Sequence, residues 1–457
     1  MDVSLAEAER HLPRRVAELM PQAVADLAEL VAYRSVADPA VEVPAQCRLA
    51  AEWVRDALVD VGLSDAALVP TPDGTDAVIA HHDGPDGAPR VLLYAHYDVQ
   101  SASNTEAWAT PPFTLTERGG RLYGRGAADC KGNILAHLTA LRALRADGEY
   151  PISLTVVVEG SEEQGTGGLE RYVEANPEEF AADVILIQDT GNVAVGVPTL
   201  TVSLRGVSDV VVHVESLAGE LHSGAFGGAA PDALAALIAI LASLRDAEGN
   251  TTVRGLDASG TWDGSPYDAE QFRRDAGIVD GAVVIGSGTV ADAVWARPAL
   301  TVLGIDAPPV VGSVAAIQPR ASARLNLRVP PGTDADDAQR ALVEHVHAVA
   351  PWGVRVTVET GGTGQPFKAR TDTPEFAALH EALADAFGAE TVTSGQGGSI
   401  PLTSTLSRVQ PGASIVMLGV AEPASRMHAP NESVDPREIE HIALGEALFL
   451  RRLGADS

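Results

Sequence analysis

The sequence contains only two cysteines and about half as many basic as acidic residues. Cys47 and Cys130 cannot build a disulfide framework of the kind that holds small secreted domains together, which favours a reducing compartment. Lysine and arginine total 32 against 62 aspartates and glutamates, a formal net charge of -30. This imbalance disfavours nucleic acid and anionic membrane surfaces as partners.

Long apolar runs are also missing. No stretch of about 18 apolar residues occurs, which disfavours a transmembrane helix. The first residues, MDVSLAEAERHLPRRVAEL, lack the apolar centre of a signal peptide. We therefore expect a cytoplasmic protein that does not associate with membranes.

Two common hydrolase signatures do not occur. The G-x-S-x-G motif of serine hydrolases is absent, and Ser399, in the sequence GGSIP, lacks the glycine two places on. The H-E-x-x-H motif of one class of zinc peptidases is absent as well. A serine mechanism is therefore disfavoured, and any hydrolytic chemistry has to come from another arrangement of residues.

The alternation of strand-like and helix-like segments predicts an α/β protein with an insertion. Apolar strand-like runs near residues 91–95, 152–159 and 184–188 alternate with helical patterns, which is typical of a mostly parallel mixed sheet flanked by helices. From Arg205-Gly206 the pattern changes to period two, and strands and helices follow in an α+β order up to about Lys368. With 457 residues the chain is long enough for two domains. We predict one domain from residues 1–206 and 369–457, and an inserted domain from residues 207–368.

Histidines and carboxylates recur just past the predicted strands or at the start of a predicted helix. The set comprises two histidines and five carboxylates: His96, Asp98, Asp129, Glu162, Glu163, Asp189 and His428. The carboxyl ends of parallel strands meet at one edge of a sheet, where ligands bind. Acids crowded at such an edge repel each other, and a pair of divalent ions would neutralise them.

This acidic edge favours a metal-dependent amide hydrolase. One of the adjacent glutamates can bind a metal ion while its neighbour takes a proton from water. Asp129, at the head of a helix, can offer both oxygens to two ions. Histidine and carboxylate donors suit zinc, manganese or cobalt. The spacing alone leaves open an acidic edge that binds calcium or no ion at all.

One loop of the inserted domain combines a histidine with several glycines. His222 lies in the stretch LHSGAFGG, and a mobile loop of this kind can serve as a substrate-binding element. A histidine in such a loop is otherwise a surface or structural residue.

Seven strings of the chain occur in the order found in a known family. They are YAHYDVQ, WATPPFTL, LYGRGAADCKGN, VVVEGSEEQGTGGLE, SLRGV, LHSGAFGG and GGSIP. In these strings the chain closely resembles the M20 metallopeptidases, and within them the carnosinase-like cytosolic dipeptidases. The resemblance implies that residues 1–206 and 369–457 form a catalytic domain with two divalent ions, zinc being our first choice and manganese or cobalt the alternatives. It also implies that residues 207–368 form a lid that makes a homodimer.

The resemblance assigns roles to the acidic residues. His96 and Asp189 match the ligands of one ion, Glu163 and His428 match those of the other, and Asp129 matches the bridging ligand. Glu162 matches the general base, and Asp98 matches the carboxylate that orients His96.

In the lid, His222 matches a histidine that reaches across the dimer to polarise the scissile carbonyl. Arg328, in ARLNLRVP, matches the clamp for a substrate carboxylate, and Gly397, Gly398 and Ser399 resemble the carboxylate-binding loop.

Two positions bear on the subgroup. Cys130 stands where members of this subgroup often carry a second acid, and the family's cis peptide bond would then join Asp129 to Cys130. Asp189 stands where aminoacylase-type relatives tend to have glutamate, which favours the peptidase members.

We therefore expect two-metal hydrolysis of the peptide bond of dipeptides or short peptides with a free C-terminal carboxylate. The alternative is an aminoacylase or carboxypeptidase-like hydrolase that acts on N-acyl amino acids. A catalytically inactive binding protein is the remaining alternative, which the complete set of ligands and the intact Glu162 disfavour.

Overall fold

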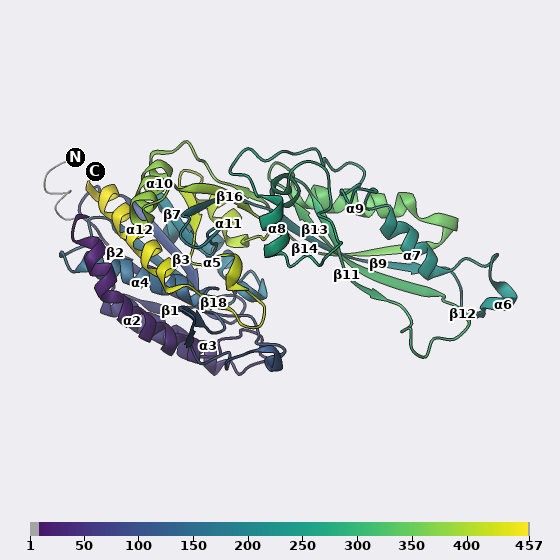
Figure 1. Ribbon diagram of the computed structural model, residues 1–457, viewed down its shortest axis with the longest axis horizontal. Helices are drawn as coiled ribbons and strands as arrows, with labels where there is room; N and C mark the ends of the chain where they lie inside the picture. The colour runs from purple at the N-terminus through teal and green to yellow at the C-terminus, as the bar shows by residue number, and fades with distance from the viewer. Residues whose placement is uncertain (1–8, 456–457) are drawn as a thin grey trace. The chain divides into compact units, whose positions relative to one another are not determined.

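The computed structural model describes residues 9–455, and this part of the chain divides into two compact units (Figure 1). The first unit is the described part of Met1–Val202, Ala369–Ser394 and Pro401–Ser457, and the second is Ser203–Lys368 with Gly395–Ile400. Residues 1–8 and 456–457, the outer ends of the predicted catalytic domain, lie outside the described residues. The division into a catalytic domain and a lid or dimerisation domain remains a prediction about roles.

A mixed β-sheet forms the centre of the first unit. In spatial order its strands are β1 (Ala67–Pro70), β2 (Asp76–His82), β6 (Ser153–Glu159), β3 (Arg90–His96), β7 (Val184–Gln188), β17 (Ser414–Leu418) and β8 (Thr199–Leu204). The central strands β6, β3, β7 and β17 are parallel, and the flanking pairs are antiparallel. Because parallel strands are covered on both faces, β7 is buried along its whole length.

In the described part of the first unit, seven α-helices accompany this sheet. They are α2 (Leu12–Ala32), α3 (Ala45–Asp60), α4 (Lys131–Arg145), α5 (Gly168–Ala175), α10 (Pro374–Phe387), α11 (Pro401–Val409) and α12 (Pro436–Ala455). Helix α12 packs against α2, α4 and α10, while α4 contacts β3 and α10 contacts β17 (Figure 1). The predicted α/β fold with a mixed sheet and flanking helices is confirmed.

A small antiparallel sheet joins two distant parts of the first unit. Its order is β18 (Ser433–Val434), β5 (Arg121–Tyr123) and β4 (Thr116–Arg118). Strand β18 follows the loop that carries His428, and β5 precedes the loop that carries Asp129. Pairing of β18 with β5 therefore brings these two loops together.

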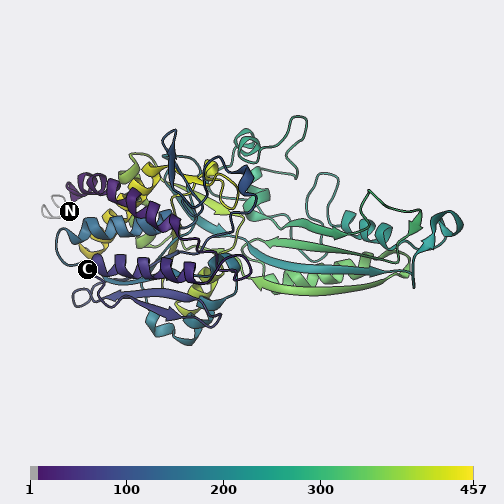
Figure 2. The same ribbon diagram turned by 90° about the horizontal axis from the view of Figure 1, so that it is seen from below.

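An antiparallel sheet with two helices forms the second unit. The strands, in spatial order, are β11 (Ala299–Asp306), β13 (Arg320–Val329), β9 (Gly206–Glu215) and β14 (Arg355–Gly364). Figures 1 and 2 show these long neighbouring strands and the helices α7 (Ala233–Ala242) and α9 (Ala335–Val349) that lie along them. Strand β9 alternates buried and half-buried side chains, as the period-two pattern of its sequence predicts.

Local sequence signals start the helices of the second unit. The side chain of Asp232 caps α7 by accepting the N–H groups of Leu234 and Ala235. Asp334 caps α9 in the same way. The apolar faces of α7 and α9 pack against β9 and β13 and form one hydrophobic core with them. This core contains Val210, Val212, Val214, Leu237, Ile240, Leu325, Leu327, Leu342 and Val346.

Shorter elements complete the second unit. They are the two-stranded antiparallel sheet of β10 (Leu221–His222) and β12 (Ala316–Ile317), the helices α6 (Ser223–Phe226) and α8 (Ala269–Asp275), and β15 (Phe367–Lys368), which pairs with the end of β8. Strand β16 (Val392–Gln396) also pairs with β8. Across residues 9–455, no helix combines the length and the apolar content needed to cross a membrane.

Candidate metal centre

The acidic residues gather where the parallel strands of the first unit end. Strand β3 lies between β6 and β7, so the carboxyl ends of the three strands are neighbours. His96 is the last residue of β3, Glu162 and Glu163 follow β6, and Asp189 follows β7 directly. The loop after β17, the next strand along, carries His428.

Two histidines lie on either side of Asp129. Nε2 of His96 is 3.2 Å from Oδ1 of Asp129 and 3.2 Å from Oδ1 of Asp189. Nε2 of His428 is 2.9 Å from Oδ2 of Asp129 and 3.1 Å from Oε2 of Glu163. The two oxygens of Asp129 thus face two separate groups of donors, each with one histidine and one further carboxylate.

The electrostatics of this cluster fit bound cations. Hydrogen bonds with Asp129 and Glu163 raise the pKa of His428 to about 10. Burial alone would lower the pKa of His96, but neighbouring groups, Asp189 among them, raise it well above its ordinary value. Burial raises the pKa of Asp189 to about 6. A cluster that holds protons so strongly attracts positive charge, and its imidazole and carboxylate donors suit a pair of divalent ions.

Cys130 is a buried thiol at the edge of the cluster. It is fully buried, lies within reach of His96 and Asp189, and donates from Sγ to the carbonyl oxygen of Gln188 at 3.0 Å. Burial raises its pKa to about 12, so without a bound ion the thiol is protonated near neutral pH. The peptide bond between Asp129 and Cys130 is cis, as the resemblance implies.

Asp98 is fully buried and orients three other residues. Its Oδ1 accepts the backbone N–H of Glu162 at 3.2 Å, and its Oδ2 accepts that of Glu163 at 3.1 Å. Nδ1 of His96 lies 3.1 Å from the carbonyl oxygen of Asp98 and 3.3 Å from its Oδ1. These contacts favour a proton on Nδ1, which leaves the lone pair of Nε2 for a metal ion.

Glu162 is the residue before Glu163. In the described part of the chain, no histidine contacts the carboxylate of Glu162. Burial raises its pKa well above the ordinary value, and the negative charge of Asp189 raises it further. A carboxylate with a raised pKa is a better proton acceptor, which suits a general base.

The loop of the two glutamates is anchored by residues that the sequence did not indicate. Oδ2 of Asp73 accepts the hydroxyl of Ser161 at 2.7 Å and also that of Thr166, on the two sides of the glutamates. Nε2 of Gln100 donates to Oε2 of Glu163 at 3.0 Å. The positions of Glu162 and Glu163 therefore depend on contacts far apart in the sequence.

A buried ion pair joins the loops of Asp129 and His428, and sequence reasoning missed it. Oε1 of Glu432 accepts the N–H groups of Ala128 and Asp129, both at 3.1 Å, and Oε2 lies 2.6 Å from Nη1 of Arg125. Glu432 follows His428 by four residues, and His428 has a left-handed backbone with φ of 61°. In the sequence, the strings GRG, which contains Arg125, and NE, which contains Glu432, indicate only turns and give no sign of an ion pair.

The predicted carboxylate-binding residues lie in the second unit. Arg328 is half-buried on β13, and burial lowers its pKa. Gly398 and Ser399 belong to the segment Gly395–Ile400, which groups with this unit. The backbone N–H of Arg205 donates to the carbonyl oxygen of Gln396 in that segment at 3.1 Å.

His222 is exposed and caps the short helix α6. Its Nδ1 accepts the N–H groups of Gly224 and Ala225 at 3.1 and 3.2 Å, so the neutral ring carries its proton on Nε2. His222 pairs with Ala316, before β13 begins, whereas Arg328 is next to the last residue of β13. At about 3.3 Å per residue the two side chains are roughly 25 Å apart or more. The second unit therefore does not bring His222 and Arg328 together.

Comparison with known proteins identifies the family. A model of peptidase family M20/M25/M40 matches residues 92–452. The cysteinylglycine-S-conjugate dipeptidase of Corynebacterium striatum is 47% identical over 409 residues, which cover 89% of this chain and 90% of that protein.

Two solved structures share the fold. The dipeptidase Dug1p from Saccharomyces cerevisiae superimposes with a TM-score of 0.83 at 23% identity and covers 98% of each chain. Human carnosine dipeptidase 1 superimposes with a TM-score of 0.81 at 25% identity and covers 99% of each chain. These matches confirm the resemblance to the carnosinase-like members that the sequence motifs indicate. The chain belongs to peptidase family M20/M25/M40.

Proposed function

We propose that the chain hydrolyses the peptide bond of dipeptides, and of other short peptides with a free C-terminal carboxylate, with the help of two divalent metal ions. The observation that carries this proposal is the pairing at Asp129, whose two oxygens face His96 at 3.2 Å and His428 at 2.9 Å. A carboxylate shared in this way between two groups of donors is suited to bridge two ions.

The proposed ligands divide into two groups. His96 and Asp189 would hold one ion, Glu163 and His428 the other, and Asp129 would bind both. Divalent ions bound there supply the positive charge that polarises a carbonyl group and lowers the pKa of water. Zinc is our first choice for this set of nitrogen and oxygen donors, and manganese and cobalt are the alternatives.

Glu162 is proposed to move the proton. Its raised pKa makes it able to accept a proton from a water molecule as that water adds to the scissile carbonyl carbon. The same carboxylic acid then donates the proton to the nitrogen of the leaving amine. Asp98 keeps the loop in position through the N–H groups of Glu162 and Glu163.

The substrate carboxylate is proposed to bind Arg328 together with Gly398 and Ser399. Within the described residues Arg328 forms no ion pair, so its guanidinium is available to a ligand. A planar guanidinium can pair with a carboxylate through two parallel hydrogen bonds. This contact would select substrates with a free C-terminus.

His222 is proposed to donate from Nε2–H to the oxygen of the scissile carbonyl, from the partner chain of a homodimer. The fixed tautomer supports a donor at Nε2. His222 and Arg328 of one chain are roughly 25 Å apart, so one dipeptide cannot contact both residues of the same chain. This distance supports a site that takes Arg328 from one chain and His222 from the other.

An exposed apolar surface beside His222 supports dimer formation through the inserted domain. Val310, Val311 and Val314 are 92%, 90% and 71% exposed. The same loop continues to Ala315, whose carbonyl oxygen accepts the N–H of Ser223 at 2.9 Å. Apolar side chains exposed in this number next to a site residue are typical of a protein–protein contact.

A mixed dimer of His222→Ala and Arg328→Met chains is expected to recover about half of the activity of the wild-type dimer, since one of its two equivalent sites has both residues intact. Each variant alone is expected to lose about a hundredfold or more in kcat/KM. Two different affinity tags allow the mixed dimer to be purified and assayed for amino acid release. Metal content serves as the control and should match that of the wild type in all three samples. A mixed dimer no more active than its parents would refute the contribution of His222 from a partner chain.

The substrate is proposed to be a dipeptide. The relative with 47% identity is described as a cysteinylglycine-S-conjugate dipeptidase, and a human relative with 28% identity as a β-Ala-His dipeptidase. These relatives favour dipeptides over the N-acyl amino acids of the aminoacylase alternative. They likewise disfavour an inactive binding protein, and we propose cysteinylglycine and its S-substituted forms as the first substrates to test.

A substrate panel tests the proposed function. Cysteinylglycine, S-benzyl-cysteinylglycine and β-Ala-His are compared with an N-acetyl amino acid, before and after chelation and readdition of zinc, manganese or cobalt. We expect release of free amino acids from the dipeptides, loss with chelator, and recovery with about two ions per chain. The C-terminal amide of the preferred dipeptide is the matched control, and its kcat/KM should fall roughly tenfold to a hundredfold, because the charged contact with Arg328 is lost. Preference for the N-acetyl amino acid would move the function to the aminoacylase class.

A cytoplasmic location is proposed from the state of the thiols and the net charge. Cys47 and Cys130 are both free, which suits a reducing compartment. The net charge of -30 favours solubility in a crowded interior and disfavours anionic surfaces. Cell fractionation with a thiol-labelling reagent tests this location.

A further inference from the structure

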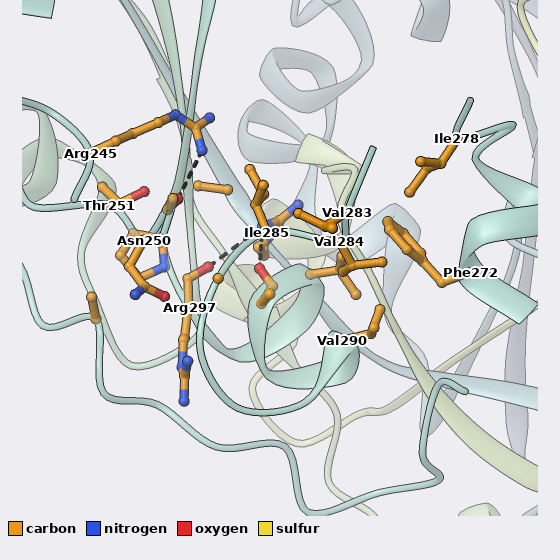
Figure 3. Close-up of a pocket in the computed structure, with 18 residues that line it drawn as sticks. Arg245, Asn250, Thr251, Phe272, Ile278, Val283, Val284, Ile285, Val290 and Arg297 are labelled. Carbon is orange, nitrogen blue, oxygen red and sulfur yellow. Dashed lines mark hydrogen bonds between the residues drawn. The ribbon is translucent and has the colours of Figure 1, made fainter. Parts of the chain in front are cut away.

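A cavity of about 370 Å³ lies inside the second unit (Figure 3). Its walls come from Arg205, which follows β8, from the segment after α7, from α8, and from residues 278–299 that lead into β11. The volume is within the range of small-molecule sites, roughly 300–1,000 Å³. The cavity belongs entirely to one compact unit.

Most of the lining is apolar. Figure 3 shows the apolar side chains gathered on one side of the cavity and Arg245, Asn250 and Thr251 on the other. The apolar group consists of Phe272, Ile278, Val283, Val284, Ile285 and Val290. Val283 and Ile285 are 75% and 54% exposed, so an apolar ligand could cover surface that now faces water.

The charged side chains that line the cavity all have one sign. Arg205, Arg245 and Arg297 are among the 18 lining residues, and none of these 18, all in the described part of the chain, is aspartate or glutamate. This is unusual in a chain with 62 acidic and 32 basic residues. The lining therefore favours an anionic ligand over a neutral or cationic one.

Arg205 is the arginine whose hydrogen bonding is incomplete. Arg205 is 8% exposed, and its Nε has no hydrogen-bond partner. Its Nη1 lies 3.4 Å from the carbonyl oxygen of Ala293 and 3.5 Å from that of Arg297. Among residues 9–455 no carboxylate forms an ion pair with it. Arg297, by contrast, donates to the carbonyl oxygens of Gly260 and Ser287 at 2.7 and 2.6 Å.

A buried guanidinium without a counter-ion costs folding free energy, and a carboxylate would offset this cost by accepting its N–H groups. We propose that the cavity is a binding site for a small apolar carboxylate, whose hydrocarbon part contacts the valine and isoleucine side chains and whose carboxylate pairs with Arg205. Arg205 lies beside Gly397 of the proposed carboxylate-binding loop, since a Cβ added to Gly397 would lie 2.6 Å from Nη2 of Arg205, and a binding test of the cavity does not depend on catalysis.

Calorimetry with octanoate, octan-1-ol and octylamine tests the proposal on the complete metal-loaded protein. The three probes share one hydrocarbon chain and differ in the charge of the head group. We expect octanoate to bind at least about tenfold more tightly than octan-1-ol, because a charge-assisted hydrogen bond adds to apolar burial, and octylamine to bind more weakly than both. Equal affinity for octanoate and octylamine would overturn the site.

Four variants locate the binding. Arg205→Met should weaken octanoate binding about tenfold or more while leaving octan-1-ol binding unchanged, and Val284→Trp should fill the cavity and remove both. Arg324→Met, at an exposed arginine of β13 outside the cavity, is the matched control and should bind octanoate like the wild type.

Arg328→Met should also retain octanoate binding. If Arg328→Met removes octanoate binding and Arg205→Met does not, the probe occupies the substrate clamp and the proposed cavity site is wrong. Thermal unfolding confirms that each variant is folded, and loss in Val284→Trp keeps the test valid if Arg205→Met does not fold.

Discussion

Replacing Glu162 with glutamine is expected to lower kcat on the order of a thousandfold or more while leaving the metal content unchanged. Glutamine has the shape of glutamate but cannot accept a proton. The substitution therefore removes the proposed general base without leaving a cavity in the protein. Burial and the charge of Asp189 raise the pKa of Glu162, so its ionised form costs folding free energy near neutral pH. The unfolding midpoint of the chelator-treated variant should therefore equal or exceed that of the wild type.

The adjacent carboxylate provides the matched control for this prediction. Glu163 lies 3.1 Å from His428 and is a proposed ligand, so Glu163→Gln should lose metal together with activity. Metal analysis and kcat on the same preparations separate the two variants. A parallel loss of metal in Glu162→Gln would make Glu162 a ligand, and retained activity would exclude it as the base.

Asp129→Asn is expected to bind neither ion and to have activity below about one ten-thousandth of the wild type. The amide has one oxygen where the carboxylate has two, so it cannot face His96 and His428 with equivalent donors. The protein should still fold, because Glu432 holds the backbone N–H of residue 129 and not its side chain. Metal analysis after dialysis against zinc measures the loss.

Thermal unfolding gives a second measurement for Asp129→Asn. Ligands that bind only the folded state raise its stability, so zinc should raise the unfolding midpoint of the wild type and not that of the variant. Asp189→Asn is the matched control, because Asp189 contacts only His96 of the two histidines in the described structure, and this variant should lose one ion and keep the other. Two ions bound to Asp129→Asn would contradict the bridging role.

The proposed ligands could be predicted from the sequence because their positions follow local rules. A buried parallel strand ends where its apolar run ends, and the next polar residues lie at the mouth of the sheet. His96, Glu163 and Asp189 obey this rule on β3, β6 and β7. His428 lies ten positions after the end of β17, and its place in a short loop after that apolar run was the signal that predicted it.

Contacts between distant residues could not be predicted in this way. Arg125 and Glu432 are separated by 307 positions and meet at 2.6 Å because β18 pairs with β5. Nothing in the composition around either residue indicates its partner. Asp73 and Ser161 meet for the same reason, through the pairing of β2 with β6.

The sequence by itself determined the α/β character, the inserted α+β segment, the family and the set of acidic residues at the sheet edge, because each depends on local periodicity or on short motifs. Only the tertiary structure decided that Asp129 turns one oxygen to each histidine, that His222 keeps its proton on Nε2, and that His222 and Arg328 lie at opposite ends of β13. The cavity at Arg205 also depends on the tertiary structure. These features depend on the direction of side chains and on pairing between segments far apart in the chain, and only packing in three dimensions fixes them.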